Sequence, residues 1–175
     1  MSEFNQKVKF GTPIVWKNAG GDGVITLKNR AADSYVQGAK VDLGEKPADA
    51  YVVRLKTALA VAPAAGAPIR LWVAGSPHAT AGTDNPVNLT GADGLYTGYD
   101  ADAANAVAQL NASLAGVLAS VAKTATQVAD IGIWRPLHRY AIPLYHNGTA
   151  QATKDDDADH EIVLYPIIPV VEEAP

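Results

Sequence analysis

The histidines are the side chains in this sequence best suited to metal binding or acid–base chemistry. There are four of them, His78, His138, His146 and His160. No two stand at the spacing of a zinc-binding helix or loop, and the chain has no cysteine to supply a thiolate ligand or nucleophile. The sequence therefore predicts no metal centre, no bound cofactor and no cysteine chemistry.

A run of acidic residues before His160 offers the oxygen ligands that hard cations prefer. It comprises Asp155–Asp157 and Asp159, directly after Lys154. Calcium loops, however, need a glycine that permits a sharp turn and carboxylates spaced along the loop. Because blocks of like charge are usually solvated, the pattern favours an acidic loop tip over a cation site.

Two further segments match catalytic or phosphate-binding motifs only in part. The segment Gly20–Gly23 lacks both the Gly-Lys-Ser/Thr ending and the following helix of a phosphate loop. Ser76 and His78 are close in sequence, but no Gly-x-Ser-x-Gly elbow surrounds the serine. Without a convergent set of acid, base and nucleophile, we expect a protein that is not an enzyme. A hydrolase is the weakest alternative.

The aromatic residues divide into expected core and expected surface. Large side chains dominate cores, so Trp16, Trp72 and Trp134 are predicted to be buried. Tyr96 and Tyr99 lie in a glycine-rich stretch and are candidates for stacking on a sugar or a partner protein.

Composition excludes several classes of partner. The 175 residues include 14 Lys and Arg against 18 Asp and Glu, a net charge of −4, so nucleic-acid binding is not expected. No apolar stretch approaches the roughly 18 residues needed to span a membrane, and the start of the chain does not resemble a signal peptide. These features predict a protein made in a reducing cytoplasm.

The segments that must position these residues have the residue pattern of β-strands. Alternation predicts a strand over 50–60, and residues 14–28 and 50–73 are each interpreted as a β-hairpin. Residues 75–100 form a long irregular connection, a kind of loop that is usually functional or contacts partners. The buried face of the strand at 50–60 is predicted to consist of Tyr51, Val53, Leu55, Thr57 and Leu59.

The second half of the chain contains one ambiguous segment among further strands. Residues 101–122 fit helical spacing and alternation about equally well, so periodicity leaves helix and strand open. Strands are predicted over 127–134, 139–145 and 161–168, with Pro143, Pro166 and Pro169 at sheet edges or strand ends. Seven to nine strands are expected in a single β-sandwich domain spanning 1–175, with flexible arms at about 1–7 and 169–175.

Residues from about 50 to 172 also resemble a family of small structural proteins of tailed bacteriophages. The landmarks are, in order, Ile69–Pro77, Ala81–Pro86, Thr90–Tyr96, Gln109–Leu110, Gln127–Ala129, Pro136–Tyr140, Asn147–Gly148 and a final strand ending at Pro166. The resemblance implies a jelly-roll-like sandwich and favours strand over helix for residues 107–121. An Ala-rich insert at about 100–108 departs from the family pattern.

What the resemblance implies about function is a capsid decoration or cement protein that binds the assembled major capsid lattice of a virion. Self-association is expected, with a trimer as one option, and the partners are the major capsid protein or other virion proteins. A glycan-binding surface module and a tail or neck component are the alternatives. Besides the two arms, the candidate contact residues are Asp84, Asn85, Pro86, Tyr96 and Tyr99.

Overall fold

A computed structural model describes residues 4–96 and 112–173, so Tyr99 and residues 101–111 of the ambiguous segment lie outside the described residues. The described chain is almost entirely β, with two short 3-10 helices, η1 (Pro86–Asn88) and η2 (Asp157–Asp159). The strands are β1 (Phe4–Phe10), β2 (Ile14–Lys17), β3 (Gly23–Val24), β4 (Ser34–Gln37), β5 (Val41–Asp42), β6 (Tyr51–Thr57), β7 (Pro68–Ser76), β8 (Gly94–Leu95), β9 (Ser113–Ala119), β10 (Gln127–Trp134), β11 (Tyr140–Asn147) and β12 (Glu161–Glu173).

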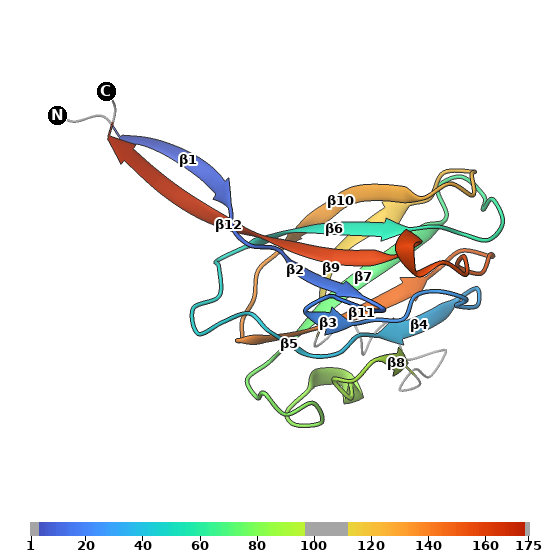
Figure 1. Ribbon diagram of the computed structural model, residues 1–175, viewed down its shortest axis with the longest axis horizontal. Helices are drawn as coiled ribbons and strands as arrows, with labels where there is room; N and C mark the ends of the chain where they lie inside the picture. The colour runs from blue at the N-terminus through green and yellow to red at the C-terminus, as the bar shows by residue number, and fades with distance from the viewer. Residues whose placement is uncertain (1–3, 97–111, 174–175) are drawn as a thin grey trace.

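The strands form two sheets that pack face to face (Figure 1). One sheet has the order β10-β6-β12-β2-β3 and the other β8-β4-β11-β7-β9, with β1 paired to β12 and β5 paired to β11. The chain crosses to the other sheet on its way from β2 to β4, returns on its way to β6, and crosses again between β6 and β7. The resulting four-strand sets, β2-β12-β6-β10 and β4-β11-β7-β9, have the connectivity of a jelly roll. The predicted all-β, jelly-roll-like sandwich is confirmed.

The main core lies between the two sheets and follows the alternation of the strands. β6 alternates buried and half-buried positions along its whole length, as predicted, and Leu59 beyond its end is also buried. Trp16 and Trp134 belong to this core. Trp72 is buried on the opposite face of its sheet, so all three tryptophans are core residues, as expected.

The two sheets meet at one corner, where β9 and β10 approach each other. A Cβ atom at Gly116 would collide with the carbonyl oxygen of Ile131, and one at Gly132 with the carbonyl oxygen of Ala115. Each strand also shifts register here, at Ala115 in β9 and at Ile131 in β10. Bulges of this kind bend strands, and the glycines let the two backbones close the corner.

Both predicted hairpins are wrong. β2 and β3 pair in parallel, with Trp16 opposite Gly23, because the five-residue connection, residues 18–22, carries the chain back along β2 before β3 begins. β6 and β7 do not pair, since the segment between them crosses from one sheet to the other. Each of these segments is nevertheless a strand, so the error concerns which strands are neighbours.

The structure also shows the conformation of residues 113–119 and the position of Pro143. Residues 113–119 form strand β9, in agreement with the resemblance and against the helical spacing. Pro143 lies inside a central strand, contrary to the prediction that it occupies an edge. The structure accommodates it because β5 pairs with Tyr140 and Ala141 while β4 pairs with residues 144–147, so Pro143 falls in the gap between them.

The two chain ends form one structural unit. β1 pairs along its whole length with the last seven residues of β12, from Phe4 opposite Glu173 to Phe10 opposite Ile167. This two-stranded unit projects from the sandwich, with the pair Phe4 and Glu173 at its tip (Figure 1). We call it the terminal ribbon (residues 4–10 and 167–173). The described parts of the two arms expected from the sequence, residues 4–7 and 169–173, thus belong to two strands that pair with each other.

Candidate interaction surfaces

The acidic run before His160 forms a loop tip fastened by lysines. Lys154 Nζ lies 2.6 Å from Asp159 Oδ2, and Lys28 Nζ lies 3.0 Å from Asp157 Oδ2. The hydrogen bond from Lys154 lowers the pKa of Asp159. In the described part of the chain, no group of three or more acidic or histidine side chains could hold a metal ion. Nor does any helix there have the length and apolar character to cross a bilayer.

Two of the four histidines are buried structural residues, a role that the sequence pattern did not reveal. His160 Nε2 lies 3.0 Å from the carbonyl oxygen of Lys154, and its Nδ1 lies 3.1 Å from Thr57 Oγ1. A neutral ring satisfies both contacts by donating from Nε2 and accepting at Nδ1. Burial lowers the pKa of His160, which favours that neutral form.

His146 is buried in the other sheet in a comparable way. Its ring stacks on Tyr35 with 4.0 Å between ring centroids, and its Nε2 lies 2.8 Å from Asp33 Oδ1. Burial lowers the pKa of His146, although the carboxylate opposes that shift. Both histidines therefore join loops to strands instead of converging on a reaction site.

The long connection after β7 is held against the body, and Lys40 is its anchor. Lys40 Nζ donates to Ser76 Oγ at 2.9 Å and to the carbonyl oxygens of His78, Thr80 and Thr83 at 2.8, 2.7 and 3.1 Å. Ser76 is buried beneath this lysine. The loop is thus a fixed part of the surface, and Ser76 serves to position it.

The candidate contact residues of this loop differ in exposure and in structural role. Asp84 is exposed, with its Oδ2 3.3 Å from His78 Nε2. Asn85 Nδ2 donates to the carbonyl oxygen of Leu89 at 2.7 Å, so its amide links the two residues that flank η1, in which Pro86 is the first residue.

Tyr96 is not the surface platform that the sequence suggested. It is only 7% exposed, because its ring packs in a second apolar cluster on the outer face of the β4-β11-β7 sheet. Tyr99, the other proposed platform, lies outside the described residues. The loop therefore covers apolar surface of its own sheet.

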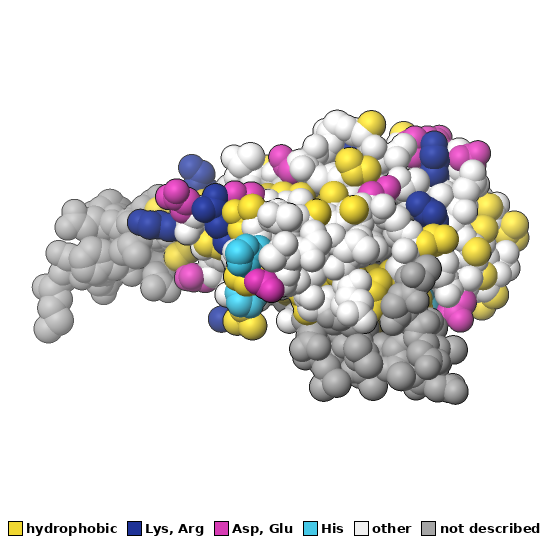
Figure 2. Space-filling view, turned by 90° about the horizontal axis from the view of Figure 1, so that it is seen from below, with side chains coloured by type: hydrophobic (Ala, Val, Ile, Leu, Met, Phe, Trp, Pro, Cys, Tyr) yellow, Lys and Arg dark blue, Asp and Glu magenta, His cyan; other side chains and the backbone are white. Residues whose placement is uncertain are grey.

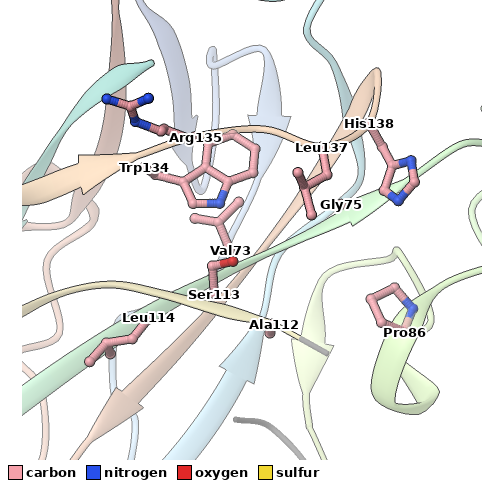
Figure 3. Close-up of a pocket in the computed structure, with 10 residues that line it drawn as sticks. All are labelled: Val73, Gly75, Pro86, Ala112, Ser113, Leu114, Trp134, Arg135, Leu137 and His138. Carbon is pink, nitrogen blue, oxygen red and sulfur yellow. The ribbon is translucent and has the colours of Figure 1, made fainter. Parts of the chain in front are cut away.

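A hollow of about 440 Å³ lies beside β9 and the start of the β10–β11 connection. Trp134, Arg135 and His138 supply its larger polar-tipped side chains, and Pro86 closes one side (Figure 3). The Arg135 guanidinium and the His138 ring lie on opposite sides of this hollow (Figure 3). The groups do not converge as an acid–base or oxyanion site requires.

Two further hollows continue from this one around the end of the sandwich that carries the terminal ribbon. One, of about 340 Å³, shares Leu137 and His138 with the first hollow. The other, of about 380 Å³, shares residues 47–49 with the second and ends against residues 166–169 at the base of the ribbon. We call the two together the arm-end trough (residues 43–49, 136–139 and 166–169).

The side chain of Leu137 stands at the edge of this trough and is 85% exposed. A single exposed apolar side chain is common on protein surfaces; what distinguishes Leu137 is its place in the lining that two neighbouring hollows share. No sequence pattern singled out Leu137, because a single leucine in a turn has no periodic pattern around it.

The terminal ribbon has a largely apolar face. Val8 is opposite Pro169 and Phe10 is opposite Ile167, and residues directly opposite or two apart share a face. Val8 is 67% exposed and Phe10 is 56% exposed. Phe10 also makes an edge contact with Tyr165, with ring centroids 6.3 Å apart, where the ribbon joins the body.

Charge gives no sign of a nucleic-acid surface on the face displayed in Figure 2, where basic and acidic side chains are interspersed. A scan against known protein families and a search of curated proteins found no match to this chain.

Proposed function

We propose that this protein is a non-enzymatic structural component of a virus particle, and specifically a capsid decoration protein that binds the assembled major capsid lattice. The observation that carries the proposal is the terminal ribbon, a two-stranded extension with exposed apolar side chains on a jelly-roll body. Jelly rolls occur in viral capsid proteins, although the fold alone does not determine function.

The ribbon supports the proposal because it is poorly suited to exist alone. Isolated two-stranded units are marginally stable in water, and both long edges of this one carry main-chain groups that can pair with a neighbour's strand. A protein that binds the assembled shell and not its separate subunits stabilises the shell by mass action. The ribbon offers such a contact without any change to the body.

The glycan-binding alternative loses support because Tyr96, one of its two proposed stacking platforms, is buried. No described feature favours it over assembly.

The direct test is the composition of particles purified from the virus that encodes the chain. Quantitative mass spectrometry is expected to find it at a copy number comparable with that of the major capsid protein. A few copies per particle would contradict the decoration role and indicate the tail or neck. Its absence from particles would overturn the virion proposal altogether.

A second test uses particles that lack the protein. Added wild-type protein should raise the temperature at which they release their genome, and Phe10→Asp should not. Val128→Asp, which alters a 57% exposed residue on β10, is the matched control and should act as wild type does.

A further inference from the structure

The oxygen atoms that surround the Lys40 ammonium group have the arrangement of a cation site. Lys40 Nζ lies 2.9 Å from Ser76 Oγ, and it lies 2.8, 2.7 and 3.1 Å from the carbonyl oxygens of His78, Thr80 and Thr83. We propose that the loop from Ser76 to Thr83 is a binding site for a monovalent cation of ammonium size, and that Lys40 supplies this cation from within the chain. The site does not depend on the virion role.

The convergence of these oxygens requires a positive charge at their centre. Oxygens that carry partial negative charge repel one another around a single point unless a cation lies between them. Rings of backbone carbonyls replace the hydration shell of K⁺ in channels on the same principle. An ammonium group has only three protons for the four acceptors around Lys40. The charge of the group, in addition to its directed hydrogen bonds, therefore accounts for the four short distances.

The distances indicate the class of cation. Ca²⁺ binds oxygens at about 2.3–2.6 Å and Mg²⁺ at about 2.0–2.1 Å, whereas N–H···O hydrogen bonds are about 2.7–3.2 Å long. The four distances around Lys40 Nζ, 2.7–3.1 Å, lie in the range of the hydrogen bonds. None of the four oxygens belongs to a carboxylate, the ligand that divalent cations commonly use. The loop therefore fits a large monovalent ion such as ammonium or K⁺.

The surroundings of Lys40 favour a cation that belongs to the chain. Ser76 is fully buried and Lys40 is half-buried, so an ion from solution loses much of its hydration shell here. Burial lowers the pKa of Lys40, and the charge of Asp84 opposes that shift. A tethered ammonium group loses less freedom on binding than a free ion does. The main-chain N–H of Lys40 also donates to the carbonyl oxygen of Gly91 at 2.8 Å, which fastens the far end of the loop to the same residue.

The cation fixes the shape of the surface above it. The side chains of His78 and Asp84, which are 58% and 62% exposed, belong to this loop or directly follow it. The loop thus has its shape before any partner binds, which lowers the cost of ordering it in a contact. Loss of the cation should release the loop and leave the sandwich intact, because none of the residues that contact Lys40 Nζ belongs to the main core.

The test removes the tethered cation and offers a free one. In Lys40→Ala, amides of residues 78–84 should exchange at least about tenfold faster than in the wild type, because a charged donor makes the stronger hydrogen bonds. Ammonium chloride or potassium chloride should restore slow exchange. Lithium chloride at the same concentration should not, because Li⁺ is too small to contact all four oxygens. Hydrogen-exchange mass spectrometry measures the loop and β6 in one sample, so β6 reports whether the body is folded.

Lys28→Ala is the matched control, because it also removes one lysine, in this case from an exposed ion pair with Asp157. Residues 78–84 of this variant should exchange as in the wild type in all three salts. Restoration of Lys40→Ala by ammonium alone supports the site and shows that it requires donor protons. The proposal is overturned if exchange in Lys40→Ala stays at the wild-type rate, if ammonium does not slow it, or if lithium slows it equally.

A measurement on the wild-type chain decides the question if Lys40→Ala does not fold. NMR of protein labelled with ¹⁵N-lysine should show that the ammonium protons of Lys40 exchange with water more slowly than those of Lys28 and Lys154, which lie in surface ion pairs. Exchange of the Lys40 protons as fast as in those two groups contradicts the proposal.

Discussion

The sandwich body and the terminal ribbon are built from the same strand, β12, yet their surroundings are opposite. Between Glu161 and Pro166 this strand has β6 on one side and β2 on the other for part of its length. Between Ile167 and Glu173 it has β1 alone. Ile162 and Leu164 are fully buried in the first part, whereas Ile168 in the second is exposed.

This difference shows that the body buries its apolar side chains within its own fold, whereas the ribbon does not. Apolar burial stabilises the body, and stabilisation scales with the apolar area removed from water. The same kind of residue in the ribbon stays in contact with water. We attribute the apolar composition of the ribbon to the partner that it is proposed to bind.

The largest expected effect comes from comparing a side-chain truncation in the body with one in the ribbon. Leu55→Ala removes a fully buried side chain from β6 and should reduce the free energy of unfolding by about 3 kcal/mol. Phe10→Ala should change the stability of the monomer by less than about 1 kcal/mol, because its side chain is already exposed. Urea unfolding of dilute protein measures both. Similar losses for the two variants would contradict the distinction.

The next effect concerns the closed corner of the body. Gly132→Ala should destabilise the protein by about 1–3 kcal/mol, because the added methyl group collides with the main-chain oxygen of Ala115. Gly82→Ala is the control, since no atom lies within 4 Å of its added Cβ. Thermal unfolding compares the two. A neutral Gly132→Ala would show that β9 and β10 do not close the corner in this way.

A smaller effect is expected from pH, and it belongs to the body alone. Burial lowers the pKa of His146 and of His160 below the ordinary value of 6.5. The unfolded chain therefore binds protons first as the pH falls through 6.5, so stability should decrease on acidification. The decrease is at most about 1.4 kcal/mol per pH unit for each histidine.

Urea midpoints at about pH 7.5 and pH 5.5 measure this dependence. His160→Gln should reduce the difference between the two midpoints, because one of the two histidines no longer titrates. A wild-type midpoint that is equal or higher at the lower pH would contradict the neutral, buried state of both rings.

The smallest effect tests the joint between body and ribbon. Arg54 forms a two-point ion pair with Asp130, with distances of 2.7 and 3.1 Å, and its guanidinium lies 4.9 Å from the centre of the Tyr165 ring. Because this pair is exposed to solvent, Arg54→Met should cost less than about 1 kcal/mol by thermal unfolding. A loss above about 2 kcal/mol would show that the joint stabilises the body.

The sequence predicted what alternation encodes and missed what depends on distant pairing. The buried face of β6 and the strand at 127–134 follow from side-chain periodicity, which is a local property. The pairing of residues 4–10 with 167–173 closes nearly the whole chain, and no local pattern reports it. For the same reason the two hairpins were predicted wrongly, because neighbouring segments need not be neighbouring strands.

The candidate surfaces show the same division. The loop at 75–96 was recognised by its length and composition, but its anchoring by Lys40 depends on a residue some 40 positions from it in the chain. Leu137 and the arm-end trough arise from three separated segments meeting at one end. Tyr96 was misplaced because a glycine-rich stretch usually signals exposure, whereas here the ring covers its own sheet.

Amide hydrogen exchange most directly tests whether the terminal ribbon is completed by a partner. At high dilution, amides of residues 7–10 and 167–170 should exchange much faster than those of β6, and at associating concentrations or on assembled particles they should become protected. Ribbon amides as slow as those of β6 in the dilute monomer, or still fast in the assembly, would contradict this account.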